Sequence, residues 1–404
     1  MGRYDFDEIV DRRNTNSMNV EGWRNYIFGV GYDKKFPIKD EEFIRMWVAD
    51  MDFAVAPEIV EAIKERADKR IFGYTKLFSN EYYNALRGWC RKRYDWDFPN
   101  EELVTSYGVI PIIYQLVEDI VGEGEKVLLL TPSYGPFKGA AVYNGVGHME
   151  SPMIIEDGEF RIDFDDLEEK AADPSVNVLI FCNPHNPTGR VWTEEELKQV
   201  GEIVEKNGLW LISDEIHCDL LRKGITHIPF GKIMPDYPRL ITCMAASKAF
   251  NIAGLEHANA IIRDKEERER FLSRDKIGQN NPLSIAAHQA AYEKGEPWLE
   301  ELREYLDGNF ALLKEFLDEY FPECNYKIPG ATYLAWVDIS PYLGDVKDHT
   351  EFFAERAGVL IEGGDKLFVG NAQGYIRLNL AIPRSVLKTA LDRMKEAMDA
   401  HIRI

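Results

Sequence analysis

A lysine at the end of an apolar segment is the residue of this chain best suited to covalent chemistry. Lys248 follows the apolar run Leu240–Met244 and lies between small residues in the segment Ala246–Leu255. At the end of a buried strand, loss of water favours the neutral amine, which can attack a carbonyl group and form a Schiff base. Most lysines are solvated surface residues, so Lys248 is a catalytic candidate only together with other segments.

A second polar segment follows the apolar run Val178–Phe181. It reads Asn-Pro-His-Asn-Pro-Thr-Gly-Arg and spans residues 183–190. The prolines fix the backbone φ angle and Gly189 permits the turn, so we expect a stiff loop. Such a loop would hold the side-chain amide of Asn186 in one orientation. An ordinary connection between a strand and a helix is the alternative.

A third candidate, Asp214, follows the apolar run Leu209–Ile212. An ionised carboxylate at a buried strand end costs free energy unless a positive group pairs with it, and a protonated ring nitrogen would serve. A carboxylate that caps the next helix is the alternative interpretation.

These three segments, in this order, resemble the pyridoxal-phosphate (PLP) enzymes of the aspartate-aminotransferase fold, class I/II. The resemblance is closest to the cystathionine β-lyase-like (C–S lyase) branch. It extends along most of the chain and depends on residues 46–53, 72–75, 214–217, 247–255 and 330–336.

The resemblance implies a role for each candidate at the cofactor. Lys248 would hold the PLP aldehyde as a Schiff base, Asp214 would hold the pyridinium proton, and Asn186 would donate to the phenolic oxygen. Tyr134 would stack on the ring. His217 would share the contact with the phenolic oxygen, although a structural histidine is an equal alternative.

The resemblance also implies how the phosphate and the substrate are bound. The backbone N–H groups of Val109 and Ile110, at an expected helix start, and the Ser247 hydroxyl would bind phosphate. Tyr74 would reach the phosphate from the second subunit of a homodimer. Arg377 would bind the α-carboxylate of an amino-acid substrate, because a guanidinium binds a carboxylate with two parallel bonds.

The chain departs from the wider family at one position. Many relatives carry a phosphate-pairing arginine eight residues after the catalytic lysine, and this chain has Glu256 there, followed by His257. A glutamate cannot pair with phosphate, so the expected phosphate site depends on backbone amides, Ser247 and Tyr74.

The composition excludes several other classes of protein. The chain has 404 residues and a formal net charge of −21, so phosphate backbones of nucleic acids and anionic membranes would repel it. We expect no metal site, because the five cysteines form no ligand pattern, and no disulfide framework. We find neither a signal sequence nor a membrane-spanning run and expect a cytoplasmic protein.

Alternating apolar runs and helical patterns between about residues 100 and 265 predict an α/β fold. The continuous apolar runs indicate a mostly parallel central sheet flanked by helices, with ligands at the carboxyl ends of its strands. After about residue 285, amphipathic helices at 298–306 and 309–321 and short strands predict a smaller α+β domain. We expect a large cofactor-binding domain of residues 46–285 and a small domain of residues 1–45 and 286–404.

Three functions are compatible with these residues. A C–S β-lyase would eliminate a thiol from a sulfur amino acid and give pyruvate and ammonia. An aminotransferase would use the same Lys248, Asp214 and Arg377. A cofactor-bound regulatory or partner-binding protein is the third alternative, although the residues before Trp47 are too few and too acidic for a basic DNA-binding module.

Overall fold

The computed structural model describes residues 2–274 and 280–403, and a seven-stranded sheet lies at the centre of the fold. β11 runs antiparallel to both of its neighbours, and the other described strands of the sheet pair in parallel. Such a sheet agrees with the prediction from the continuous apolar runs. In spatial order its strands are β2 (Leu103–Ser106), β11 (Ala258–Ile262), β10 (Leu240–Met244), β9 (Trp210–Asp214), β8 (Val176–Cys182), β3 (Lys126–Thr131) and β5 (Gly147–Pro152).

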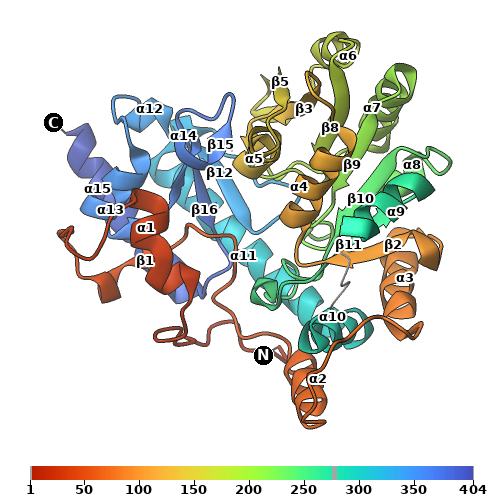
Figure 1. The fold of residues 1–404 in the computed structure, drawn as a ribbon. Helices are drawn as coiled ribbons and strands as arrows, with labels where there is room; N and C mark the ends of the chain where they lie inside the picture. Colours follow the sequence, from red (N-terminus) through yellow and green to blue (C-terminus); the bar gives the residue numbers. More distant parts are fainter. Residues whose placement is uncertain (1, 275–279, 404) are drawn as a thin grey trace.

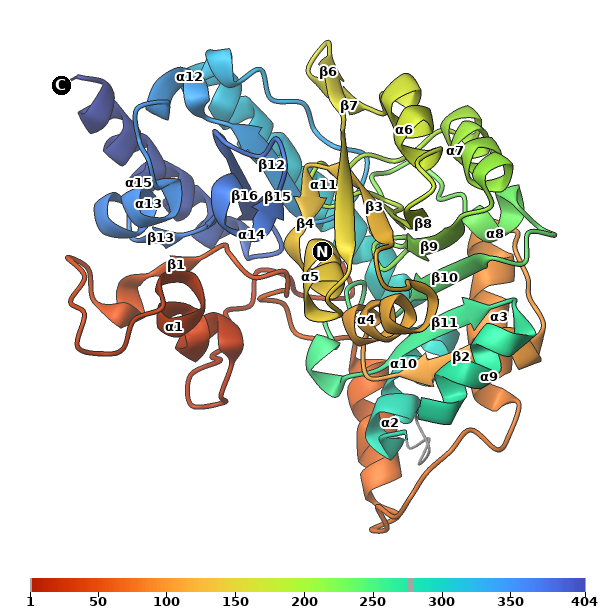
Figure 2. The ribbon, with the colours of Figure 1, turned by 45° about the horizontal axis from the view of Figure 1, so that its top comes forward.

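Helices cover both faces of this sheet, which explains why its strands are apolar on both sides. In β3, Val127 and Leu129 belong to the core on one face, and Leu128 and Leu130 belong to the core on the other. Figure 2 shows α4 and α5 side by side over the first of these faces. The helices of the first face are α4 (Val109–Ile120), α5 (Gly135–Tyr143) and α9 (Lys265–Arg274); those of the second are α6 (Phe164–Ala171), α7 (Glu194–Asn207), α8 (Phe230–Ile233), α2 (Pro57–Ala67), α3 (Glu81–Tyr94) and α10 (Pro282–Lys294).

The C-terminal residues form a second layer around a small antiparallel sheet. Elements from both ends of the chain gather there, and Figure 1 shows the red N-terminal segment beside the blue helices. The strand β1 (Ile44–Arg45) pairs with β13 (Val359–Leu360), and Trp23 and Phe43 pack on Ala354 and Leu360. The other elements are α1 (Trp23–Phe28), β12 (Leu334–Asp338), α12 (Ser340–Leu343), α13 (His349–Arg356), β14 (Glu362–Gly363), α14 (Gly364–Leu367), β16 (Tyr375–Asn379) and α15 (Arg384–Ile402).

Two small pairs of strands complete the fold. The strand β4 (Ser133–Tyr134) pairs with β15 (Phe368–Val369), so the loop after β3 is tied to the C-terminal layer. The strands β6 (Ile154–Glu156) and β7 (Glu159–Arg161) form a hairpin.

One long helix replaces the two helices expected at 298–306 and 309–321. The helix α11 (Glu296–Tyr320) is continuous through Asp307-Gly308-Asn309, a sequence that favours a break. The apolar positions Leu302, Leu306, Phe310, Leu313 and Leu317 continue one stripe across this point, and the stripe keeps the helix intact. No described helix, α11 included, has both the length and the apolar character needed to cross a membrane.

The helix α11 also contributes to two hydrophobic cores. Trp298, Leu299, Leu302 and Leu306 belong to the core shared with α3, whereas residues 310–317 belong to the core of the C-terminal layer. We therefore keep the division into residues 46–285 and residues 1–45 plus 286–404 as a proposal, with α11 as the element that links the two cores.

Candidate active site

A cavity of about 200 Å³ lies where β8, β9 and β10 end and α4 begins. Ligands of parallel sheets gather at this edge. The predicted residues that line the cavity are Val109, Ile110, Tyr134, Asn186, Asp214, His217, Ser247, Lys248 and Arg377.

A larger cavity of about 730 Å³ lies between the hairpin β6–β7 and residues 323–330. None of the predicted site residues lines it. The smaller cavity is the candidate active site, because it brings together an enclosed amine, a buried carboxylate and a buried guanidinium.

Lys248 follows β10 after three small residues, and its side chain is enclosed by the cavity wall. Burial lowers the pKa of its amine to about 8, against the opposing effect of Asp50 and with a further lowering effect from Arg377. The Nζ atom donates a hydrogen bond of 2.6 Å to the carbonyl oxygen of Ala49, which also accepts a 2.8 Å hydrogen bond from the Tyr333 hydroxyl. The amine is therefore fixed in position and partly neutral near neutral pH.

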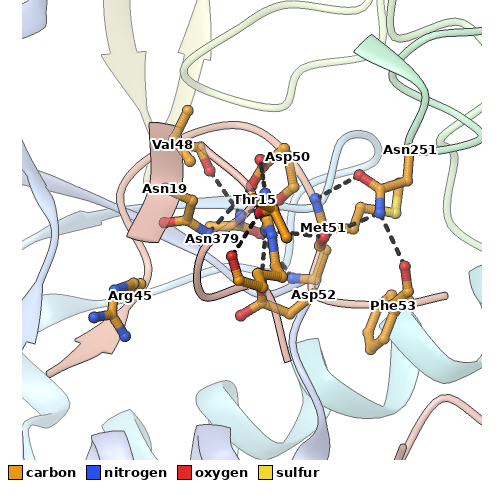
Figure 3. Close-up of polar contacts among 12 residues, drawn as sticks. Thr15, Asn19, Arg45, Val48, Asp50, Met51, Asp52, Phe53, Asn251 and Asn379 are labelled. Atoms are coloured by element: carbon orange, nitrogen blue, oxygen red, sulfur yellow. Dashed lines mark hydrogen bonds and ion pairs between the residues drawn. The ribbon is translucent and has the colours of Figure 1, made fainter. Parts of the chain in front are cut away.

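The carbonyl of Ala49 belongs to residues 46–53, an irregular segment that we call the strap. The strap lies between β1 and α2 in the sequence. Side chains from three distant parts of the chain hold it in place (Figure 3). Asn251, three residues after Lys248, donates from Nδ2 to the carbonyls of Met51 and Phe53 and accepts from the Met51 N–H. The strap is therefore bound to the same loop that carries the lysine.

Two other residues hold the strap from its opposite side. Asn379, at the end of β16, donates from Nδ2 to the carbonyls of Val48 and Asp50. Arg12 forms ion pairs of 2.5 Å with Asp50 and 2.7 Å with Asp52. Because backbone carbonyls and carboxylates of the strap are satisfied in this way, Ala49 is held against Lys248.

The carboxylate of Asp214 lies in the cavity at the end of β9, as the sequence predicts. Burial raises its pKa to about 7, although the hydrogen bond from the Ile216 N–H and the nearby Lys248 amine oppose the shift. A cationic partner would lower this pKa again and keep the carboxyl group of Asp214 ionised. Asp214 therefore has the environment expected for a residue that pairs with a protonated ring nitrogen.

His217 is buried in the same wall and is uncharged at neutral pH. Burial lowers its pKa to about 3, and the cations Lys248 and Arg377 lower it further. Its ring lies edge-on to Tyr333, and its Nδ1 atom has no hydrogen-bond partner among the described residues. A buried polar atom without a partner is unusual in a folded protein.

The loop of residues 183–190 contains hydrogen bonds between its own residues. His185 Nδ1 lies 2.8 Å from the Thr188 hydroxyl, and the Gly189 N–H donates to the His185 carbonyl. Gly189 has a φ of +67°, and a Cβ there would lie 2.5 Å from Pro329 and 2.9 Å from the Ala331 carbonyl, so only glycine fits. The loop places the Asn186 amide at the cavity.

Arg377 lies in β16 and is 2% exposed, so it faces the cavity and not solvent. Its Nη2 donates to the Trp47 carbonyl at 2.9 Å, and its Nη1 is 3.4 Å from Asn186 Oδ1. Its Nε has no partner among the described residues. The guanidinium therefore keeps donors available for an anion.

The remaining predicted residues lie at two places. Tyr134 stands at the start of α5, edge-on to Phe137, and burial raises its pKa to about 12. Val109 and Ile110 form the first turn of α4, where backbone N–H groups are free for an anion, and Ser247 lines the same cavity. Glu256 is exposed and does not line the cavity.

Tyr74 is the predicted site residue that lies outside the cavity. Its side chain is 90% exposed, in the irregular segment of residues 70–79 that we call the arm. Within one chain, Tyr74 therefore makes no part of the site.

Sequence reasoning assigned no role to several residues that the structure places at the site. Tyr333 and Asn251 lie inside motifs that carry the family resemblance, and that position was the only available signal. The contacts of Asn379 and Arg12 with the strap join residues more than 300 and about 40 positions apart and leave no local pattern.

Comparison with known proteins identifies the family. The family model of class I and II aminotransferases matches residues 41–394, and the chain belongs to this family. Cystathionine beta-lyase PatB of Bacillus subtilis (strain 168) is 36% identical over 397 residues, 97% of this chain and 99% of PatB. Protein MalY of Escherichia coli (strain K12) is 32% identical, over 98% of this chain and 99% of MalY.

A solved structure is similar over nearly the whole chain. The PLP-bound C–S lyase from Staphylococcus hominis, complexed with the inhibitor L-cycloserine, is 49% identical with a TM-score of 0.94 and covers 98% of both chains. The predicted family and the predicted aspartate-aminotransferase-like α/β fold are thus confirmed.

The residues of the cavity fit PLP. The cavity contains an enclosed amine, a buried carboxylate with a raised pKa, an aromatic side chain and a helix N-terminus. His217 and Arg377, which each have one buried nitrogen without a partner among the described residues, also line this cavity.

Proposed function

We propose that the protein is a PLP-dependent C–S β-lyase that converts a sulfur amino acid into a thiol, pyruvate and ammonia. The observation that carries this proposal is that the Lys248 amine and the Asp214 carboxylate share one cavity with Arg377. The chain is 36% identical to a cystathionine beta-lyase and 49% identical to a C–S lyase, which favours elimination over other PLP chemistry.

We propose that the residues of the cavity hold the cofactor as follows. Lys248 anchors the aldehyde, Asp214 keeps a proton on the ring nitrogen, and Asn186 donates to the phenolic oxygen, with His217 beside it. Tyr134 covers the ring, and the amides of Val109 and Ile110 bind phosphate together with Ser247. When bound, PLP supplies a ring that accepts the electrons released at the substrate Cα.

Lys248 then moves a proton. With PLP bound, the Nζ atom of Lys248 would act as the general base that takes the proton from the substrate Cα. Its pKa of about 8, lowered by burial, keeps a useful fraction of the amine unprotonated near neutral pH. The carbonyl of Ala49, 2.6 Å from Nζ, fixes the direction from which the amine approaches.

Arg377 binds the α-carboxylate of the substrate in this proposal. Its position between Asn186 and the Trp47 carbonyl fixes the plane of the guanidinium. A substrate held this way would lie in the cavity that Lys248 and Asp214 also line.

An assay without keto acid tests the lyase activity. The holoenzyme is incubated with cystathionine or cysteine, and pyruvate is measured; we expect pyruvate to accumulate over many turnovers. The family also contains aminotransferases. If product forms only when a keto acid is added, and amino groups are exchanged one for one, the protein is an aminotransferase and the lyase proposal is wrong.

We also propose a homodimer in which Tyr74 contacts the cofactor phosphate of the other subunit. The support is the exposure of the arm, whose Ile71, Phe72, Tyr74 and Phe78 are 72%, 57%, 90% and 90% exposed. An apolar segment of this kind is suited to burial against another chain. We propose a cytoplasmic location, which is supported by five free, buried cysteines.

A further inference from the structure

One end of the cavity contains an ionisable side chain directly after the position of the usual arginine. Glu256, at the position of the usual arginine, has a φ of +47° after the turn Ala253–Leu255 and is exposed to solvent. The next residue, His257, is 3% exposed and lines the cavity. The chain therefore turns the glutamate outward and the histidine inward.

Strand register places His257 at the expected phosphate site. Ala258, the first residue of β11, pairs with Ser106, the last residue of the antiparallel β2. His257 is therefore beside Tyr107 and Gly108, directly before the first turn of α4. The free N–H groups of that turn are the ones proposed to bind the phosphate.

The imidazole of His257 is held in one orientation. Its Nε2 lies 2.8 Å from the Tyr82 hydroxyl, which lies 2.8 Å from Asn259 Oδ1. Tyr82 and His288 pack edge-on against the ring, with centroids 5.2 and 4.8 Å away. Nδ1 has no partner among the described residues. The fixed ring therefore offers one nitrogen to a ligand.

We propose that His257 binds the cofactor phosphate through Nδ1 and takes the role that Glu256 cannot fill. This inference rests on the proposed function, because it needs PLP in the cavity. The Tyr82 hydroxyl donates its proton to Asn259 Oδ1, so it accepts a hydrogen bond from Nε2. Nδ1 can therefore donate to phosphate when the ring is protonated, because Nε2 carries the single proton of the neutral ring.

The groups packed against His257 do not compete with an anion. They are the Tyr82 hydroxyl and the His288 ring, and neither carries a negative charge at neutral pH. Without an anion, burial and His288 hold the pKa of His257 well below its ordinary value. A phosphate dianion in contact with Nδ1 favours the protonated ring.

Paired substitutions separate phosphate binding from a structural role. In His257→Asn the amide nitrogen lies close to the place of Nδ1, whereas in His257→Gln it lies near Nε2 and keeps only the contact with Tyr82. Apoprotein of each variant is titrated with PLP and with pyridoxal, which lacks the phosphate, and binding is followed by cofactor absorbance.

We expect His257→Gln to weaken PLP about 10- to 100-fold, as loss of a hydrogen bond to a charged group does, with pyridoxal affinity changed less than about twofold. His257→Asn should keep most of the PLP affinity. His288→Asn is the matched control, because an asparagine amide lies close to the place of Nδ1, which bonds the Ser284 carbonyl, and His288 does not line the cavity. It should not change the ratio of the two affinities.

The outcomes are distinct. If His257→Gln weakens PLP and pyridoxal equally, or changes neither, His257 does not bind phosphate. If asparagine and glutamine behave alike, the contact does not run through Nδ1. If the wild-type protein binds no PLP, the proposed function fails first, whatever His257 does. Thermal unfolding of each apoprotein shows whether the variant is folded.

Discussion

The strap and the arm are both irregular segments in the first eighty residues, yet their surroundings are opposite. In the strap, Met46, Trp47, Met51 and Phe53 are buried, and its carbonyls and carboxylates are bound by Arg12, Asn251 and Asn379. In the arm, Tyr74 and Phe78 are each 90% exposed. The strap side of the site is completed within one chain, whereas the proposed role of the arm requires a second chain.

The largest expected effect is that of Lys248→Ala, which removes the amine that the strap holds. We expect loss of the covalently bound cofactor and a fall in kcat of at least 10²–10⁴-fold, the usual contribution of a general base. Cofactor absorbance and steady-state kinetics measure both.

The strap itself should survive this change, because the Tyr333 hydroxyl still donates to Ala49. The free energy of unfolding of the apoprotein should therefore fall by no more than about 1 kcal/mol. A larger loss of stability would mean that Lys248 holds the strap in place. The expected result is that the strap positions Lys248.

The second effect is on the strap. Asn251→Ala leaves the Met51 N–H and the carbonyls of Met51 and Phe53 without their partner. We expect the free energy of unfolding to fall by about 1–3 kcal/mol, the cost of unsatisfied buried groups, together with a lower kcat. Urea denaturation and kinetics are the measurements.

Residue 251 also has a φ of +56°, which disfavours alanine. Asn251→Gly removes the same hydrogen bonds without that strain and serves as the control. If Asn251→Gly is as stable as the wild type, the hydrogen bonds do not hold the strap.

The third effect tests the arm. Tyr74→Phe removes one hydroxyl, so we expect PLP affinity to fall about tenfold while the free energy of unfolding of the isolated chain stays the same. Mixing Tyr74→Phe subunits with Lys248→Ala subunits should restore some wild-type sites, because each hybrid dimer combines an intact Lys248 with an intact Tyr74. Activity no greater than the sum of the separate variants would show that Tyr74 acts within its own chain.

The smallest expected effect is on the pH dependence of stability. It concerns Asp214, which contacts neither the strap nor the arm. Burial raises its pKa to about 7 in the folded apoprotein, from the model-peptide value near 3.8. Between these values the folded state binds more protons than the unfolded state, so this contribution to stability is complete below about pH 4 and is lost as the pH rises through 7. Asp214→Asn should remove that slope from urea-denaturation data, and Asn251→Ala should keep it.

Local pattern was sufficient for the parts of the fold and site that depend on neighbouring residues. Lys248, Asp214 and Asn186 each follow a continuous apolar strand, and parallel strands bring such ends together. The strand β10 (Leu240–Met244) has the residues expected from its apolar run.

Contacts between distant residues could not be predicted in this way. Asn379 and Arg12 are brought to the strap by tertiary structure, across 331 and 40 positions of the sequence. The break expected near Gly308 is absent because tertiary packing on both cores outweighs the local preference of Asp-Gly-Asn. The inward position of His257 depends on the register of β11 with β2, which the sequence of β11 alone does not specify.

The continuity of α11 has a thermodynamic consequence. A rigid rod of 25 residues, about 37 Å long at 1.5 Å per residue, is anchored by its first half in one core and by its second half in the other. If either core unfolded alone, the apolar residues in half of α11 would be exposed to solvent. Heating should therefore denature the whole chain in a single cooperative step.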